Sequence, residues 1–159
     1  MSTDWPVFLQ SEQHTRLRDA IRGALGGWRR FLVAIDGVDA AGKSNLGRYL
    51  GWQLGMPVIE TDLYFNTEQG GLSYHFDALR LNLDARLSRD RPVIVEGVRV
   101  LAIVQELSLV PDFLIWVEQE GHTGSHLLTE QLSTYQTEFA ARSRADWIFT
   151  WQPDDLTPA

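Results

Sequence analysis

The hydrophobic residues of this chain fall into short uninterrupted runs that alternate with longer segments of mixed polarity. An almost wholly apolar run bounded by turn residues is typical of a strand that is buried on both faces of a sheet. Five such runs are present, at Phe31–Ile35, Pro57–Thr61, Pro92–Glu96, Phe113–Val117 and Ala145–Phe149. The pattern therefore predicts five short strands.

Between these runs, apolar side chains recur at intervals of three or four residues, the spacing of a helix with one buried face. In the first such segment, Leu17, Ile21 and Leu25 share one face, and Gly26 ends the pattern. Residues 62–72, which contain Asn66 and a pair of glycines, read as a loop. We expect helices over 11–25, 44–54, 73–89, 98–107 and 123–141.

Strands that alternate with helices indicate an α/β fold with three layers, in which helices cover both faces of a five-stranded parallel sheet. The length of 159 residues suits a single domain over 1–159. We expect its core at about 31–150, preceded by the helix at about 11–25 and followed by a flexible tail at about 152–159. Ligands of such sheets bind at the carboxyl ends of the strands, so the residues that follow each run are the candidates for function.

Composition narrows the class of protein. A hydrophobic content of 44% argues against disorder, and a net charge of −7 argues against a protein that coats nucleic acid or a membrane surface. The chain has no cysteine, which excludes disulfides and thiolate chemistry. The sequence predicts no secretory leader, since MSTDWPVFLQ lacks a basic start and a long apolar run, and no apolar run approaches about 18 residues. We therefore expect a cytoplasmic protein that acts on a small molecule, and a homo-oligomer is compatible with the sequence.

The first strand leads into a loop, GVDAAGKS, that matches the phosphate-binding pattern G-x-x-x-x-G-K-[ST]. Glycines allow the tight turn, and successive N–H groups together with the following helix would attract an anion. Lys43 would reach the β- and γ-phosphates of ATP, and the Ser44 hydroxyl would ligate Mg²⁺. Whether Asp39 contacts a ligand or is a solvated turn residue stays open. The predicted nucleotide contacts are Gly37, Val38, Asp39, Ala40, Ala41, Gly42, Lys43, Ser44 and Asn45.

Lys43 is the one lysine of the chain. The Asn-Lys-x-Asp signature of Ras-like GTPases needs a further lysine, so that class is excluded. The Gly-x-Gly-x-x-Gly pattern of dinucleotide reductases does not follow the first run. The remaining classes are small kinases and nucleotide-binding modules without catalysis.

Two acids follow later strands. Asp62 comes directly after the second run, and Glu96 ends the third. If these strands are neighbours, both carboxylates face the γ-phosphate, where one can take the proton of an acceptor hydroxyl and the other can hold Mg²⁺. Each acid alone is more readily explained as a strand-end cap or a solvated turn residue.

Several segments in order, from IDGVDAAGKS and TDLYF through YHFDALRLNLDARL and RPVIVEG to PDFLIWVE and RADWIF, resemble the uridine kinase-like branch of the P-loop kinases. The resemblance covers about 31–149. It implies the sheet order 2-3-1-4-5 and phosphoryl transfer from ATP to a hydroxyl. It also implies that Asp62 is the catalytic base, that Glu96 lies near the metal, and that Phe76 begins the helix on the substrate side.

The chain departs from this family where an arginine-bearing lid should close over the phosphates. No lysine or arginine occurs from Val100 to Ala141. Arg99, Arg142 and Arg144 are the candidates to replace the lid arginines, and Tyr64, Phe65 and His75 are candidate substrate contacts. An arginine at the transition state is worth about 10³–10⁵ in rate. Its loss would leave a nucleotide binder with little turnover.

We therefore expect a Mg²⁺- and ATP-dependent kinase of a small metabolite or nucleoside, with Lys43, Asp62 and Glu96 as the catalytic residues. The alternative is a nucleotide-binding module of the same fold with little or no kinase activity. A third reading is an interaction scaffold whose loop binds phosphate alone. The sequence does not identify the acceptor.

Overall fold

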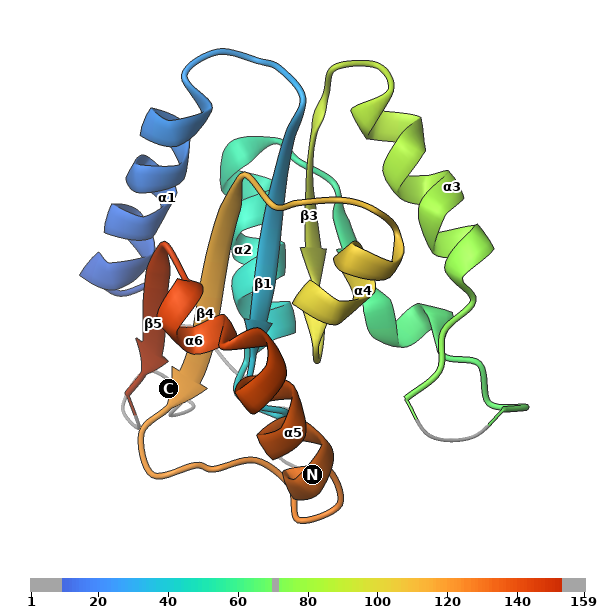
Figure 1. Ribbon diagram of the computed structural model, residues 1–159. Coiled ribbons are helices and arrows are strands. Elements are labelled where there is room, and N and C mark those ends of the chain that lie inside the picture. Colours follow the sequence, from blue (N-terminus) through green and yellow to red (C-terminus); the bar gives the residue numbers. More distant parts are fainter. Residues whose placement is uncertain (1–9, 70–71, 153–159) are drawn as a thin grey trace, which may run out of the picture.

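Five parallel strands form one sheet in the order β2-β3-β1-β4-β5 in the computed structural model, which describes residues 10–69 and 72–152. The strands are β1 (Phe31–Gly37), β2 (Val58–Glu60), β3 (Pro92–Glu96), β4 (Phe113–Gln119) and β5 (Trp147–Trp151). The order and the α/β class are those expected. All strands therefore end at the same edge, which lies at the bottom of Figure 1.

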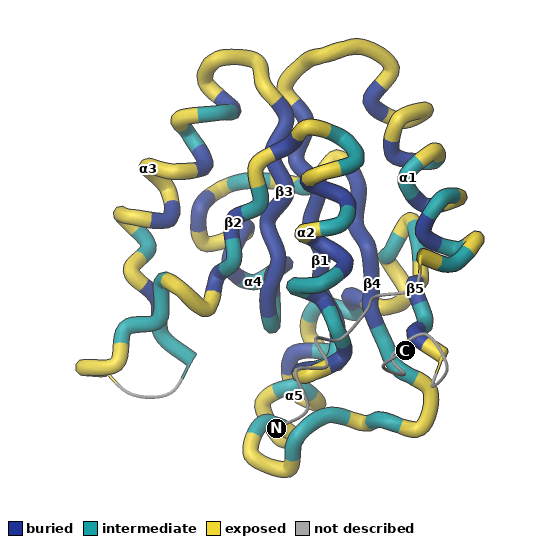
Figure 2. Tube along the Cα trace, turned by 180° about the vertical axis from the view of Figure 1, so that it is seen from behind, coloured by how far each residue is buried: buried dark blue, intermediate teal, exposed yellow. Residues whose placement is uncertain are grey.

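Helices cover both faces of this sheet. On one face lie α1 (Glu12–Leu25) and α2 (Lys43–Leu54), which contribute to a core with the side chains of β1, β3, β4 and β5. The other face packs against α3 (Phe76–Leu87), α4 (Val100–Glu106), α5 (Thr129–Phe139) and α6 (Ala141–Arg144). Figure 2 shows the consequence, since β1 and β3 are buried throughout while the outer sides of α1 and α3 are exposed.

The register places functional segments side by side. Ile35 of β1 lies opposite Glu96 of β3, and Gly37 lies opposite Val117 of β4. The loop that follows β1 therefore starts directly beside the end of β3. Because β2 pairs with β3 up to Glu60, the segment that follows β2 reaches the same edge.

Three expected helices are shorter than their periodicity suggests, and the one expected over 98–107 spans Val100–Glu106. The helix expected over 73–89 begins at Phe76, because Tyr74 forms a bridge with Phe65 and His75 donates its N–H to the Tyr64 carbonyl at 2.7 Å. The helix expected over 123–141 starts only at Thr129. Gly121 and Gly124 adopt positive φ in the preceding segment, which is irregular.

The loop expected over 62–72 contains a short 3₁₀ helix, η1 (Thr61–Tyr64), that starts directly after β2. Ala140 at φ +49° separates α5 from α6, which accounts for the broken helix at this end. The expected tail lies outside the described residues from 153 onward. None of the helices in the described part of the chain has the length and apolar character of a membrane-spanning segment.

Candidate functional site

The loop between β1 and α2 has the geometry of an anion site. Gly42 adopts φ +83°, and a Cβ at this position would lie 2.6 Å from Nε1 of Trp151, so glycine is required on both counts. The N–H groups of Gly42 through Asn45 donate no hydrogen bond to any other residue that the structure describes. They form the free N-terminus of α2, which attracts negative charge. The geometry thus agrees with the predicted phosphate site.

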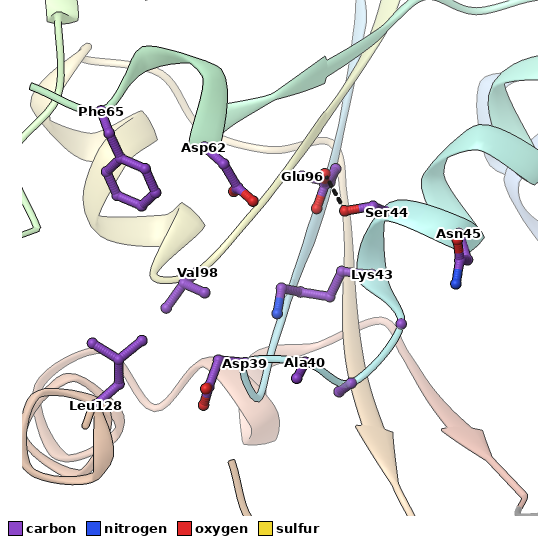
Figure 3. Close-up of a pocket in the computed structure, with 12 residues that line it drawn as sticks. Asp39, Ala40, Lys43, Ser44, Asn45, Asp62, Phe65, Glu96, Val98 and Leu128 are labelled. Atoms are coloured by element: carbon purple, nitrogen blue, oxygen red, sulfur yellow. Dashed lines mark hydrogen bonds between the residues drawn. The ribbon is translucent and has the colours of Figure 1, made fainter. Parts of the chain in front are cut away.

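Lys43 is 6% exposed and points into a cavity of about 470 Å³ at this edge of the sheet (Figure 3). Its Nζ donates to the Val38 carbonyl at 2.6 Å. Burial lowers the pKa of Lys43 below its ordinary value, and the nearby carboxylates of Asp36 and Glu96 oppose the shift. A buried cation whose hydrogen-bond acceptor is a neutral carbonyl is available to an incoming anion.

Ser44 and Glu96 present a pair of oxygens in the same cavity. The Ser44 hydroxyl donates to Oε1 of Glu96 at 2.9 Å, which the dashed line in Figure 3 marks. Burial raises the pKa of Glu96, and the nearby Asp62 adds to the shift while the Ser44 hydrogen bond opposes it. Hydroxyl and carboxylate oxygens are ligands that Mg²⁺ takes together with substrate phosphates. These two residues therefore fit the role of a magnesium site.

Asp62 completes the set of predicted catalytic residues. It lies on η1, is exposed, and lines the same cavity as Lys43 and Glu96. The segment η1 packs closely against the end of β3, since a Cβ at Gly97 would lie 1.8 Å from Thr61 Oγ1. This packing holds Asp62 at the cavity. The glycine after Glu96 therefore lets the segment that carries Asp62 approach the end of β3.

Asp39 holds the segment that follows β4 against the phosphate loop. Both of its carboxylate oxygens accept the Ser125 N–H, at 3.0 and 2.9 Å, and its carbonyl oxygen is 2.9 Å from Nε2 of His122. Burial acts to raise the pKa of Asp39, but the Ser125 hydrogen bonds and Lys43 outweigh it, so the pKa is lowered. Asp39 therefore fastens the segment that stands where a lid was expected, and it also lines the cavity around Lys43.

Asp36 lies beneath the phosphate loop and is fully buried. Its carboxylate accepts hydrogen bonds from the N–H of Gly37 at 2.8 Å, the N–H of Leu101 at 3.2 Å and the hydroxyl of Tyr135. Burial raises the pKa of Asp36 in spite of these bonds. The network connects the end of β1 to α4 and α5.

The three residues predicted to contact the substrate lie in different parts of the structure. Phe65 lines the cavity with Lys43 and Asp62. Tyr64 instead lines another cavity along β2, with Pro57 among its neighbours, and the exposed His75 caps the start of α3. The structure thus brings one of these three residues to the phosphate site.

The candidate lid arginines lie elsewhere. Arg142 forms an ion pair with Glu118, with its Nε and Nη2 at 2.8 and 3.1 Å from the two carboxylate oxygens. Arg144 donates to the Phe139 carbonyl at 3.2 Å. Arg99 lines a neighbouring cavity. Among the described residues that line the cavity around Lys43, no arginine is present.

The residues that support the site were not predicted from the sequence. Asp36 left a signal, since it is a charged residue directly after an apolar run, and its burial follows from the extension of β1 to Gly37. Tyr135 left none, because a tyrosine at that spacing fits an ordinary helix face. Val98 and Leu128, which line the cavity, are likewise indistinguishable in the sequence from core residues.

No family model and no curated protein matches this sequence. Solved structures do match. A structure described as a possible uridine kinase from Bacillus stearothermophilus aligns with a TM-score of 0.61 and 18% identity, over 87% of this chain and 97% of that one. An unliganded sugar kinase from Janibacter sp. HTCC2649 aligns with a TM-score of 0.51 and 17% identity, over 77% of this chain and 84% of that one. At these identities the likeness concerns the fold, and this chain has the fold of the P-loop kinases with the expected sheet order.

Proposed function

We propose that this protein is a Mg²⁺- and ATP-dependent phosphotransferase that phosphorylates a hydroxyl of a small metabolite. The observation that carries the proposal is that Lys43, Ser44, Asp62 and Glu96 all line one cavity at the ends of three adjacent strands. Two acids beside a phosphate loop are more than anion binding needs.

Each side chain has a role that follows from its position. Lys43 and the free N–H groups of the loop bind the β- and γ-phosphates. Ser44 and Glu96 would hold Mg²⁺, which supplies further neutralisation of phosphate charge. Asp62 accepts the proton of the acceptor hydroxyl as the new O–P bond forms and the bond between the γ-phosphorus and the bridging oxygen of ADP breaks. ADP leaves with the electron pair of that broken bond.

The experiment is a screen for ADP release with ATP, Mg²⁺ and a panel of nucleosides, sugars and hydroxy acids. We expect release that depends on one class of acceptor and that disappears in Asp62→Asn. Lys43→Ala should weaken ATP binding as well, because charge-assisted hydrogen bonds contribute about 1.5–3 kcal/mol each. ATP affinity that is unchanged in Lys43→Ala would refute the assignment of the phosphate site.

A second candidate function is favoured by one observation, the absence of arginine from the described lining of the cavity. A nucleotide-binding module with little turnover would bind ATP through Lys43 and release no ADP with any acceptor. The same screen separates the two candidates, since acceptor-dependent turnover that requires Asp62 excludes the module.

A further inference from the structure

A second cavity, of about 170 Å³, lies next to the phosphate site on the side of α3 and α4. Its walls are mainly apolar and aromatic, with Leu72, Tyr74, Phe76 and Ala102 among the lining residues. Two charged side chains, Arg99 and Glu106, also line it. Arg99 precedes α4 and comes three residues after Glu96. The cavity thus places a cation beside the proposed acceptor region.

The guanidinium of Arg99 has no polar partner within the described part of the chain. Its Nε is buried and donates no hydrogen bond, and no described carboxylate lies within ion-pair distance of it. The Cζ atom of Arg99 lies over the ring of Tyr135, 5.8 Å from the ring centroid. Arg48 and Arg142, by comparison, each bind a carboxylate through two nitrogens. A buried donor without an acceptor is costly, so this position is suited to an acceptor that comes from outside the chain.

The backbone at Arg99 supports the same reading. Arg99 adopts φ +59° and ψ +38°, a left-handed conformation that is unfavourable for residues other than glycine. Such strain persists where the surrounding structure imposes it, and it is concentrated at binding sites. Here it accompanies a side chain whose Nε is buried against α5 and unpaired.

Residues that line one cavity contact residues that line the other. Phe65 and Val98 line the phosphate cavity, and Tyr74 and Arg99 line the second one. The rings of Phe65 and Tyr74 stack at 5.0 Å, and the Tyr74 hydroxyl donates to the Val98 carbonyl at 3.4 Å. Burial raises the pKa of Tyr74 to about 12, with Arg99 opposing and Asp62 adding to the shift. The Tyr74 hydroxyl is therefore within electrostatic range of both charges.

We propose that Arg99 binds an anionic group of the acceptor, so that the substrate is a small alcohol that also carries a carboxylate or a phosphate. A guanidinium binds either group through two parallel hydrogen bonds. The acceptor would lie against Phe65 and Tyr74, with its hydroxyl at Asp62 and its acidic group at Arg99. This inference rests on the proposed function for the identity of the hydroxyl site, while the anion site itself is independent of turnover.

The test follows the Arg99 side chain directly, first with acceptor-like anions in the absence of nucleotide and then, in a separate titration, with ATP. Protein labelled with ¹⁵N-arginine in the Lys43→Ala background, in which the phosphate loop is weakened, is titrated with acetate, D-glycerate, methyl phosphate and, as a neutral comparator, glycerol. We expect the anions to shift the Arg99 Nε–H resonance and to bind roughly 10- to 100-fold more tightly than glycerol. Acetate and methyl phosphate separate a carboxylate site from a phosphate site.

Matched variants distinguish an effect of the Arg99 charge from a loss of the folded structure. Arg99→Gln should abolish anion binding, and Arg99→Lys should restore part of it, while Arg89→Gln removes the same charge at an exposed position and should change nothing. Glu106→Gln removes the carboxylate that lines the cavity and should tighten anion binding roughly two- to fivefold. Circular dichroism of each variant checks that it is folded.

An Arg99 resonance that none of the three anions perturbs would overturn the proposal, as would equal anion binding by folded Arg99→Gln. Arg99 that responds to ATP but to no acceptor-like anion would assign it to the transferred phosphate instead, which also contradicts the proposal. Anion binding at Arg99 without turnover of any acceptor would support the anion site and would refute only the proposed function.

Discussion

The hydroxyl of Tyr135 donates a hydrogen bond to the buried carboxylate of Asp36. Asp36 directly precedes the phosphate loop, and Tyr135 lies in the middle of α5. The same hydroxyl also accepts the N–H of Leu101 at 3.1 Å. The helix α5 is therefore fastened to the base of the proposed nucleotide site.

The hydrogen bond from Tyr135 to Asp36 should make a measurable contribution to the free energy of unfolding. Tyr135→Phe leaves a buried carboxylate with one partner fewer, and we expect a loss of about 1–3 kcal/mol in the free energy of unfolding. Tyr49→Phe is the matched control, because the Tyr49 hydroxyl is buried without a partner among the described residues and its removal should cost little. Urea unfolding measures both. Equal midpoints for the two variants would show that the bond to Asp36 contributes nothing.

Gly97 should be intolerant of even a methyl group. A Cβ there meets Thr61 Oγ1 at 1.8 Å, so Gly97→Ala should destabilise the fold by about 1–3 kcal/mol and displace Asp62. Thr61→Ala in the same chain should recover part of the loss, as a double-mutant cycle would reveal. Gly23→Ala is the control, since nothing lies within 4 Å of its added Cβ in α1. A Gly97→Ala protein as stable as the wild type would contradict the close contact.

Nucleotide binding should weaken at alkaline pH. Burial lowers the pKa of Lys43, so in the free protein this side chain loses its proton, and with it its charge, below the pH of an ordinary lysine. Because only the charged form attracts phosphate, ADP affinity should fall as pH rises through that pKa, by up to about tenfold per pH unit. Calorimetry from about pH 7 to about pH 10 measures the fall. Lys43→Arg, whose guanidinium stays charged, should not show it.

The segment 120–128 should loosen when its anchor is weakened. Asp39→Asn removes the negative charge and one of the two oxygens that accept the Ser125 N–H. We expect the Ser125 amide to exchange with solvent about tenfold faster. Asp112→Asn is the control, because Asp112 accepts the N–H of Leu32 at the opposite end of β1 and should leave Ser125 unaffected. Unchanged exchange at Ser125 in Asp39→Asn would exclude the anchor.

The fold was largely readable from the sequence because each strand is a separate apolar run. Both ends of the strand Pro92–Glu96 were predicted correctly, and the loop before Lys43 was recognisable by its glycines. Helix ends were predicted less well, because hydrophobic spacing continues through residues that tertiary contacts remove from the helix. Tyr74 is such a case, since it has helical spacing yet forms a bridge with Phe65.

The site could be predicted only as far as strand ends determine position. Asp62 and Glu96 follow neighbouring strands, and the sheet order places both at one cavity. The direction of a long side chain is not encoded in this way. Arg142 precedes β5 and was a reasonable candidate for the phosphates, but its two nitrogens bind Glu118 instead. Arg99, the closest of the three candidates in sequence to Glu96, faces the neighbouring cavity.

Lys43 gives this protein a chemical property that a chain with many lysines lacks. Every other cationic side chain of fixed charge is an arginine, so a reagent that acylates lysine amines has one side chain to find. That amine lies in the cavity proposed to bind nucleotide, and its lowered pKa increases the share of the reactive neutral form. The extent of lysine modification in the whole chain would therefore report the occupancy of a single site.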